Sequence, residues 1–83
     1  MKTTLRFICP EDKSILWRDE SGNNQMLVGD SIFFGGPMFV VVGRTFVNSK
    51  QELQSLVIDI AAKKPSINDK YLLYNYGFKD YEN

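Results

Sequence analysis

The stretch MFVVVGRTFV, residues 38–47, decides the fold class of this chain. Most of its residues are β-branched or aromatic, which favours a strand. Its apolar side chains fall on both faces of an extended backbone, so we predict a central strand or a strand of a closed barrel. Gly43 inside this strand predicts a bulge or a bend.

The next segment, residues 48–62, is compatible with two structures. Ser49-Lys50-Gln51-Glu52 matches a helix capping box, and the apolar residues after it have helical spacing. A helix would leave Ile58 off its apolar stripe. The β-branched run of residues 57–60 favours instead a strand over residues 51–61, antiparallel to the long strand before it. Local signals alone lean slightly to the helix.

Two further strands are expected at the N-terminus. Residues 3–9 alternate, with Leu5, Phe7 and Cys9 on one face. Residues 14–19 follow after a turn that begins at Pro10. We therefore predict a β-hairpin, with Cys9 as a small buried hydrophobic residue.

The connection to the long strand contains turns and one short strand within residues 26–34. Asp30 follows a glycine, and its carboxylate can accept backbone N–H groups of the turn. Phe33 and Phe34 must point to opposite faces of the strand. Gly35-Gly36-Pro37 leads into a strand rather than a helix, so it predicts a hairpin turn and not a phosphate-binding loop.

The chain from Phe7 to about Ile60 resembles small uncharacterised bacterial and phage-type proteins with an SH3-like barrel. The resemblance implies that the segment after residues 38–47 is a strand, and it implies a fold but no activity. The residues that carry it are Ile15-Leu16-Trp17, Val28-Gly29-Asp30, Ile32, Phe34, Gly36, Phe39, Val41-Val42 and Arg44-x-Phe46.

The fold expected from these signals is mostly β. We predict a single domain of residues 1–83, with a β core in residues 1–62 and an aromatic C-terminal segment in residues 66–83. The core would contain about five antiparallel strands in an SH3-like barrel or meander. The alternative is an α+β fold in which residues 49–64 form a helix over a four-stranded sheet.

The C-terminal segment also allows two structures. Asn68 can cap a short helix over residues 69–76, closed by Gly77 with Phe78 packing back. An edge strand over residues 71–76 satisfies the same sequence. The local pattern does not separate these two structures.

Composition excludes several kinds of site. The chain has ten Lys and Arg, ten Asp and Glu, one Cys and no His. Neither a His-based catalytic triad nor a thiolate zinc site can be built from it. Domains that bind duplex nucleic acid usually carry a basic excess, so duplex is not expected as a partner. The free Cys9, the missing glycosylation motif and the missing signal-peptide or membrane-spanning stretch favour a cytoplasmic protein.

These observations predict a non-catalytic protein-interaction or structural module of phage or mobile-element origin. Asp12, Asp19, Glu20 and Asp30 are interpreted as solvated turn carboxylates, and no catalytic, cofactor or metal residue is assigned. Protein binding or self-association is expected through aromatic residues, with residues 66–83 removable from a folded β core. The alternative is single-stranded nucleic-acid binding by exposed aromatics. The candidate surface residues are Trp17, Phe33, Arg44, Tyr71, Tyr74, Tyr76 and Phe78.

Overall fold

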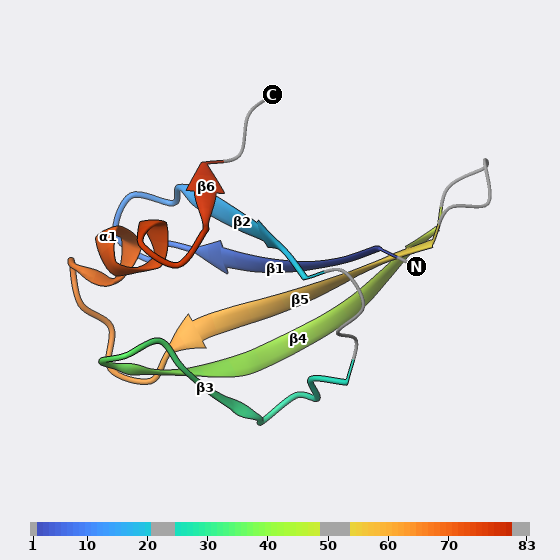
Figure 1. Ribbon diagram of the computed structural model, residues 1–83, viewed down its shortest axis with the longest axis horizontal. Coiled ribbons are helices and arrows are strands. Elements are labelled where there is room, and N and C mark those ends of the chain that lie inside the picture. Colours follow the sequence, from blue (N-terminus) through green and yellow to red (C-terminus); the bar gives the residue numbers. More distant parts are fainter. Residues whose placement is uncertain (1, 21–24, 49–53, 81–83) are drawn as a thin grey trace.

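The chain forms one six-stranded sheet with a short helix packed at one end (Figure 1). The computed structural model describes residues 2–20, 25–48 and 54–80. The strands lie side by side in the order β3-β4-β5-β1-β2-β6. The elements are β1 (Lys2–Ile8), β2 (Ile15–Asp19), β3 (Ser31–Phe33), β4 (Met38–Asn48), β5 (Gln54–Ala62), α1 (Asp69–Tyr74) and β6 (Lys79–Asp80).

The sheet is mixed and is not closed into a barrel. The hairpins β1–β2 and β4–β5 are antiparallel, as predicted. In contrast, β1 and β5 are parallel neighbours, with Lys2 opposite Ser55 and Phe7 opposite Ile60. An all-antiparallel sheet and an SH3-like barrel are therefore not confirmed. Short turns impose antiparallel hairpins locally, whereas the β1–β5 pairing joins residues about fifty positions apart and leaves no local signal.

The ambiguous segment after the long strand is a strand over Gln54–Ala62, so a helix over residues 49–64 is wrong for these residues. Residues 49–53 lie outside the described part. β5 is hydrogen-bonded on both sides, by β4 and by β1, so it is a central strand of the sheet. The register shifts between Val41 and Gly43, which confirms the predicted bulge.

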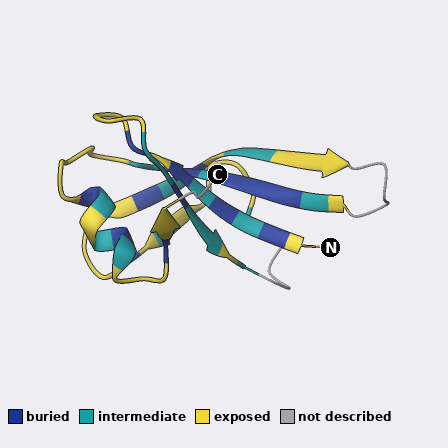
Figure 2. Ribbon diagram, turned by 90° about the horizontal axis from the view of Figure 1, so that it is seen from above, coloured by how far each residue is buried: buried dark blue, intermediate teal, exposed yellow. Residues whose placement is uncertain are grey.

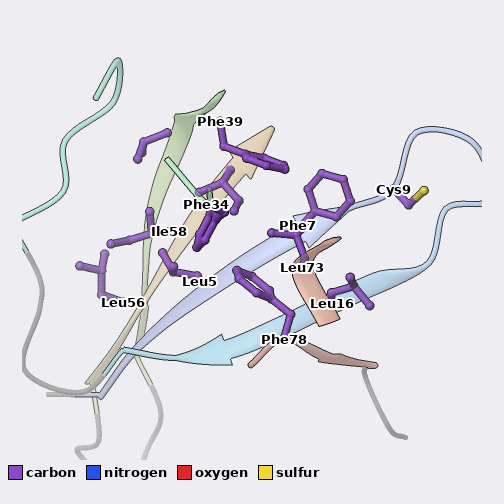
Figure 3. Packing of buried hydrophobic residues seen from close by; sticks show 12 residues of the cluster. Leu5, Phe7, Cys9, Leu16, Phe34, Phe39, Leu56, Ile58, Leu73 and Phe78 are labelled. Atoms are coloured by element: carbon purple, nitrogen blue, oxygen red, sulfur yellow. The ribbon is translucent and has the colours of Figure 1, made fainter. Parts of the chain in front are cut away.

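The core lies on one face of the sheet, beneath α1 and the C-terminal residues. In Figure 3 side chains from β1, β2, β4 and β5 converge with Phe34, Leu73 and Phe78. Phe34 makes edge-to-face contacts with Phe39 and Phe78, at centroid distances of 5.4 and 5.7 Å. The fully buried residues of this core are Leu5, Phe7, Leu16, Phe39, Val41, Leu56, Ile58 and Leu73.

The C-terminal segment supplies part of this core. It forms a short helix, as one of the two predicted structures required, and not an edge strand over residues 71–76. Asn68 precedes the helix but makes no side-chain cap. Gly77 adopts a φ of 85°, which turns the chain so that Phe78 packs back under the sheet. The two residues after Phe78 then pair with β2 as β6.

Candidate interaction surface

The opposite side of the sheet, called here the outer face, carries no helix or strand layer in the described part of the chain (Figure 1). Side chains alternate along a strand, so Thr4, Arg6 and Ile8 of β1 point to the outer face while Leu5 and Phe7 point to the core. Figure 2 shows a second contrast, between neighbouring strands: the C-terminal end of β4 is exposed, whereas the middle of β5 is buried.

An apolar row crosses the outer face near the end where α1 packs against the other side. Ile8 pairs with Ile15 of β2, and Ala61 pairs with Val40 of β4. Because Phe7 lies opposite Ile60, Ile8 lies next to Ala61. The four side chains therefore form one continuous row across β2, β1, β5 and β4, called here the apolar row.

A groove of about 310 Å³ lies beside the apolar row. Ile8 and Ala61 line one part of it, and Val42, at the bulge of β4, lines another. Val42 is 53% exposed because the bulge adds it to the strand without a partner across the pair. The groove is therefore a shallow apolar depression with the bulge on one side.

Phe33 and Met38 extend the apolar surface to β3. They are paired across the β3–β4 hairpin and both are exposed on the outer face. At the rim, the Lys63 Nζ donates to Ser31 Oγ at 2.8 Å. Several of the exposed large apolar side chains of the described residues lie on this face. They are Ile8, Phe33, Met38, Val42 and Val47.

A polar row runs parallel to the apolar row, two residues along each strand. Arg6 lies between Trp17 of β2 and Asp59 of β5. Its Nε and Nη2 donate to the Asp59 carboxylate at 2.5 and 2.9 Å, and its guanidinium lies 5.6 Å from the Trp17 ring centroid. The bidentate hydrogen bond to Asp59 raises the pKa of Arg6 above its usual value. This row therefore carries two balanced charges.

A second depression of about 370 Å³ lies at the other side of Trp17, near the N-terminus of β1. Lys2 and Lys79 line it together with Thr4 and Asp19. It combines an aromatic ring with two ammonium groups and one carboxylate. This corner of the outer face is therefore basic on balance.

The predicted surface residues do not form one surface. Trp17 and Phe33 both lie on the outer face, but β4, β5 and β1 separate their strands. Arg44 lies on the core-facing side of β4, opposite Ile58, with its guanidinium 6.0 Å from the Phe46 ring centroid. Tyr71, Tyr74 and Tyr76 belong to α1 and the turn after it. Phe78 is only 2% exposed and belongs to the core, so it supplies no surface.

The tyrosines of the helix belong to a polar cluster on the far side of the molecule. Tyr74 donates its hydroxyl to Asp80 at 2.5 Å, and this bond raises the pKa of Tyr74. Lys70 Nζ donates to Asp12 at 3.0 Å, while Asp12 also accepts the backbone N–H and the hydroxyl of Ser14 at 2.9 and 2.6 Å. These three bonds hold the pKa of Asp12 well below its usual range. The bond from Lys70 joins α1 to the β1–β2 turn.

Sequence reasoning missed Ile8, Met38 and Val42. Ile8 has the parity of Thr4 and Arg6, so its outward position could have been read from the alternation of β1. The outward position of Val42 could not be predicted from alternation, because it depends on the exact place of the bulge. The exposure of Met38 follows from its pairing with Phe33, which only the hairpin register shows.

Within residues 2–20, 25–48 and 54–80, no group of three or more Cys, Asp or Glu side chains is arranged to hold a metal ion. No described helix is long and apolar enough to cross a membrane. The comparisons with known proteins gave no match to a family model, to a curated protein or to a solved structure.

Proposed function

We propose that this protein is a small non-catalytic interaction module that binds a protein partner on its outer face. The observation that carries the proposal is the uncovered apolar row with its neighbours Phe33, Met38 and Val42. A sheet face normally packs against another layer, above all where two strands are parallel, as β1 and β5 are. Contiguous exposed apolar surface on a small protein is typical of a binding site.

The partner surface should be apolar at its centre and of mixed charge at its edge. Arg6 and Asp59 neutralise each other in an ion pair, so this position does not require a charged group on the partner. Lys63 at one rim and Lys2 and Lys79 at another favour carboxylates opposite them. Aromatic and aliphatic anchors at the centre of an interface contribute most of the affinity.

A photo-crosslinking experiment in the native host tests the proposal. A photoreactive phenylalanine analogue at Val42 should capture a protein, and the same analogue at Tyr71, on the exposed side of α1, should not. The captured protein should then bind the purified chain and lose affinity when Ile8 is replaced by Asp. Capture from Tyr71 alone would overturn the proposal and would favour the C-terminal tyrosines as the binding surface.

Single-stranded nucleic acid is a second candidate ligand, supported by the depression next to Trp17. An aromatic ring between Lys2 and Lys79 offers one stacking position with cations for the backbone. Trp17 is the single tryptophan of the chain, so its fluorescence reports on this position directly. Quenching by single-stranded oligonucleotides, weakened by salt and lost in Lys2→Gln/Lys79→Gln, would favour this function. Unchanged fluorescence would remove it.

A further inference from the structure

The residues of the outer face are arranged so that this face is complementary to itself. On β5 and the residue after it, Asp59, Ala61 and Lys63 alternate with the core-facing Ile60 and Ala62, so all three belong to the outer face. The Lys63 N–H bonds to the Met38 carbonyl at 3.0 Å, which extends the β4–β5 ladder by one position. Asp59 and Lys63 thus lie at equal distances on either side of Ala61.

The same symmetry holds on β4. Val40 pairs with Ala61, and the apolar side chains of Met38 and Val42 lie on either side of it along the strand. On β1, Ile8 continues the apolar row at the level of Ala61. Consider a two-fold axis that runs along the apolar row. It places the apolar row of one copy on the apolar row of a second copy. Residues on one side of the row then face residues from the other side of the row in the second copy.

We propose that the outer face binds a second copy of this chain, so that the two sheets pack face to face in a two-fold symmetric dimer. This inference rests on the proposed function and names its partner. Val42 of one copy then faces Met38 of the other, and Lys63 of one copy faces Asp59 of the other. A two-fold interface must be complementary to itself in this way.

Charge and area both favour a second copy. The chain carries no net charge, so no overall repulsion opposes its association. Opposite charges, Lys63 and Asp59, face each other twice, and the Arg6–Asp59 pair remains intact. Covering the apolar row and its exposed neighbours would bury roughly 500 Å² per copy, which corresponds to the lower end of specific interfaces and predicts a weak, reversible dimer.

Sedimentation from about 10 μM to about 1 mM tests the dimer, because a weak, reversible dimer should dissociate within this range of concentration. The mass should rise with concentration in the native chain. Val42→Asp should weaken association about tenfold or more, because it places a carboxylate in the apolar centre. Ile67→Asp is the matched control, since Ile67 is an aliphatic residue at least as exposed as Val42 and lies outside the strands, just before α1. Equal effects of the two substitutions would overturn the inference.

Nuclear Overhauser effects between the methyl groups of Val42 and Met38 test the symmetry itself. Four residues of strand separate them within one chain by about 13 Å, which is too far for such a contact. In the dimer they face each other, so mixed differently labelled chains should show the contact, and dilution should remove it. A dimer without this contact would contradict the arrangement.

The outcomes separate this inference from the proposed function. The chain could stay monomeric at about 1 mM while the analogue at Val42 captures a different protein. This outcome would contradict the dimer and support the proposed function. A monomeric chain whose Val42 position captures no protein would contradict both the dimer and the proposed function. A dimer that also captures no other protein keeps both, with the second copy as the partner.

Discussion

Both faces of the sheet carry large apolar side chains, but these side chains lie in different environments. Phe33 and Phe34 are adjacent in the chain, yet Phe33 is 63% exposed and Phe34 is 4% exposed. The strands alone do not produce this difference. It arises because Leu73 and Phe78, from the C-terminal segment, pack against one face and nothing described packs against the other. The apolar residues of a strand are therefore candidates for burial, and segments that are distant in the sequence determine which of them are buried.

The largest effect should come from removing the cover of the core face. Deleting residues 66–83 takes away Leu73, Phe78 and β6 and exposes Phe34. A domain of 83 residues buries a small core, so we expect the truncated chain to lose cooperative unfolding. This expectation is the opposite of the prediction made from the sequence. A truncated chain with a sharp thermal transition would show that the segment is an appendage.

A matched pair of substitutions compares the faces directly. Phe39→Ala removes a ring that makes edge-to-face contacts with Phe7 and Phe34, at 5.9 and 5.4 Å. We expect it to lower the free energy of unfolding by about 3–5 kcal/mol. Phe33→Ala on the outer face should change it by less than about 0.5 kcal/mol in the dilute protein.

Urea denaturation at low micromolar concentration measures both variants of this pair. If Phe33→Ala also costs several kcal/mol, Phe33 is covered in solution even when the protein is dilute, and the outer face is not open. If Phe39→Ala costs little, the core face is packed differently. Either result would remove the basis of the comparison.

The polar row of the outer face should contribute less to the free energy of unfolding than Phe39 does. Asp59→Asn replaces a charged bidentate acceptor for Arg6, whose side chain is 30% exposed. Since solvent screens this pair, we expect a loss of about 1 kcal/mol. The fluorescence of Trp17 should change as well, because the guanidinium over its ring loses its anchor. Glu11→Gln, in the exposed β1–β2 turn, is the control, and an equal effect there would contradict the role of the pair.

The hairpins and turns could be predicted from the sequence because their signals are local. The alternation of residues 3–9, Gly43 at the bulge and Gly35-Gly36-Pro37 between β3 and β4 each depend on neighbours in the chain. The carboxylate of Asp30 accepts the N–H of Leu27 at 2.8 Å, as the turn residues indicate. Local chemistry thus gave most strands and their hairpin pairing.

The parallel pairing and the outer face could not be predicted in the same way. Ile58 lies opposite Leu5 of β1, and no residue near Ile58 encodes that contact. Phe78 was also named as a surface residue because the local pattern did not separate a helix closed by Gly77, with Phe78 packing back, from an edge strand. The candidate surface was consequently found in part: Trp17 and Phe33 were predicted, and the apolar row between them was not.

The smallest effect is expected where the covering segment is tied to the β1–β2 turn. Asp12 accepts two hydrogen bonds from Ser14 and one from Lys70 of α1, which lower its pKa in the folded protein. A group whose pKa is lowered by folding stabilises the protein above its unfolded pKa, about 3.9 for Asp, and loses this contribution as the pH falls through its folded value. Asp12→Asn removes the charge at every pH. The native chain should therefore be slightly more stable than Asp12→Asn at pH 6, and the difference should shrink as the pH falls below about 4. Thermal unfolding of both proteins over this pH range measures the difference; a gap that stays constant or widens in acid would show that the Asp12 carboxylate does not link the turn to α1.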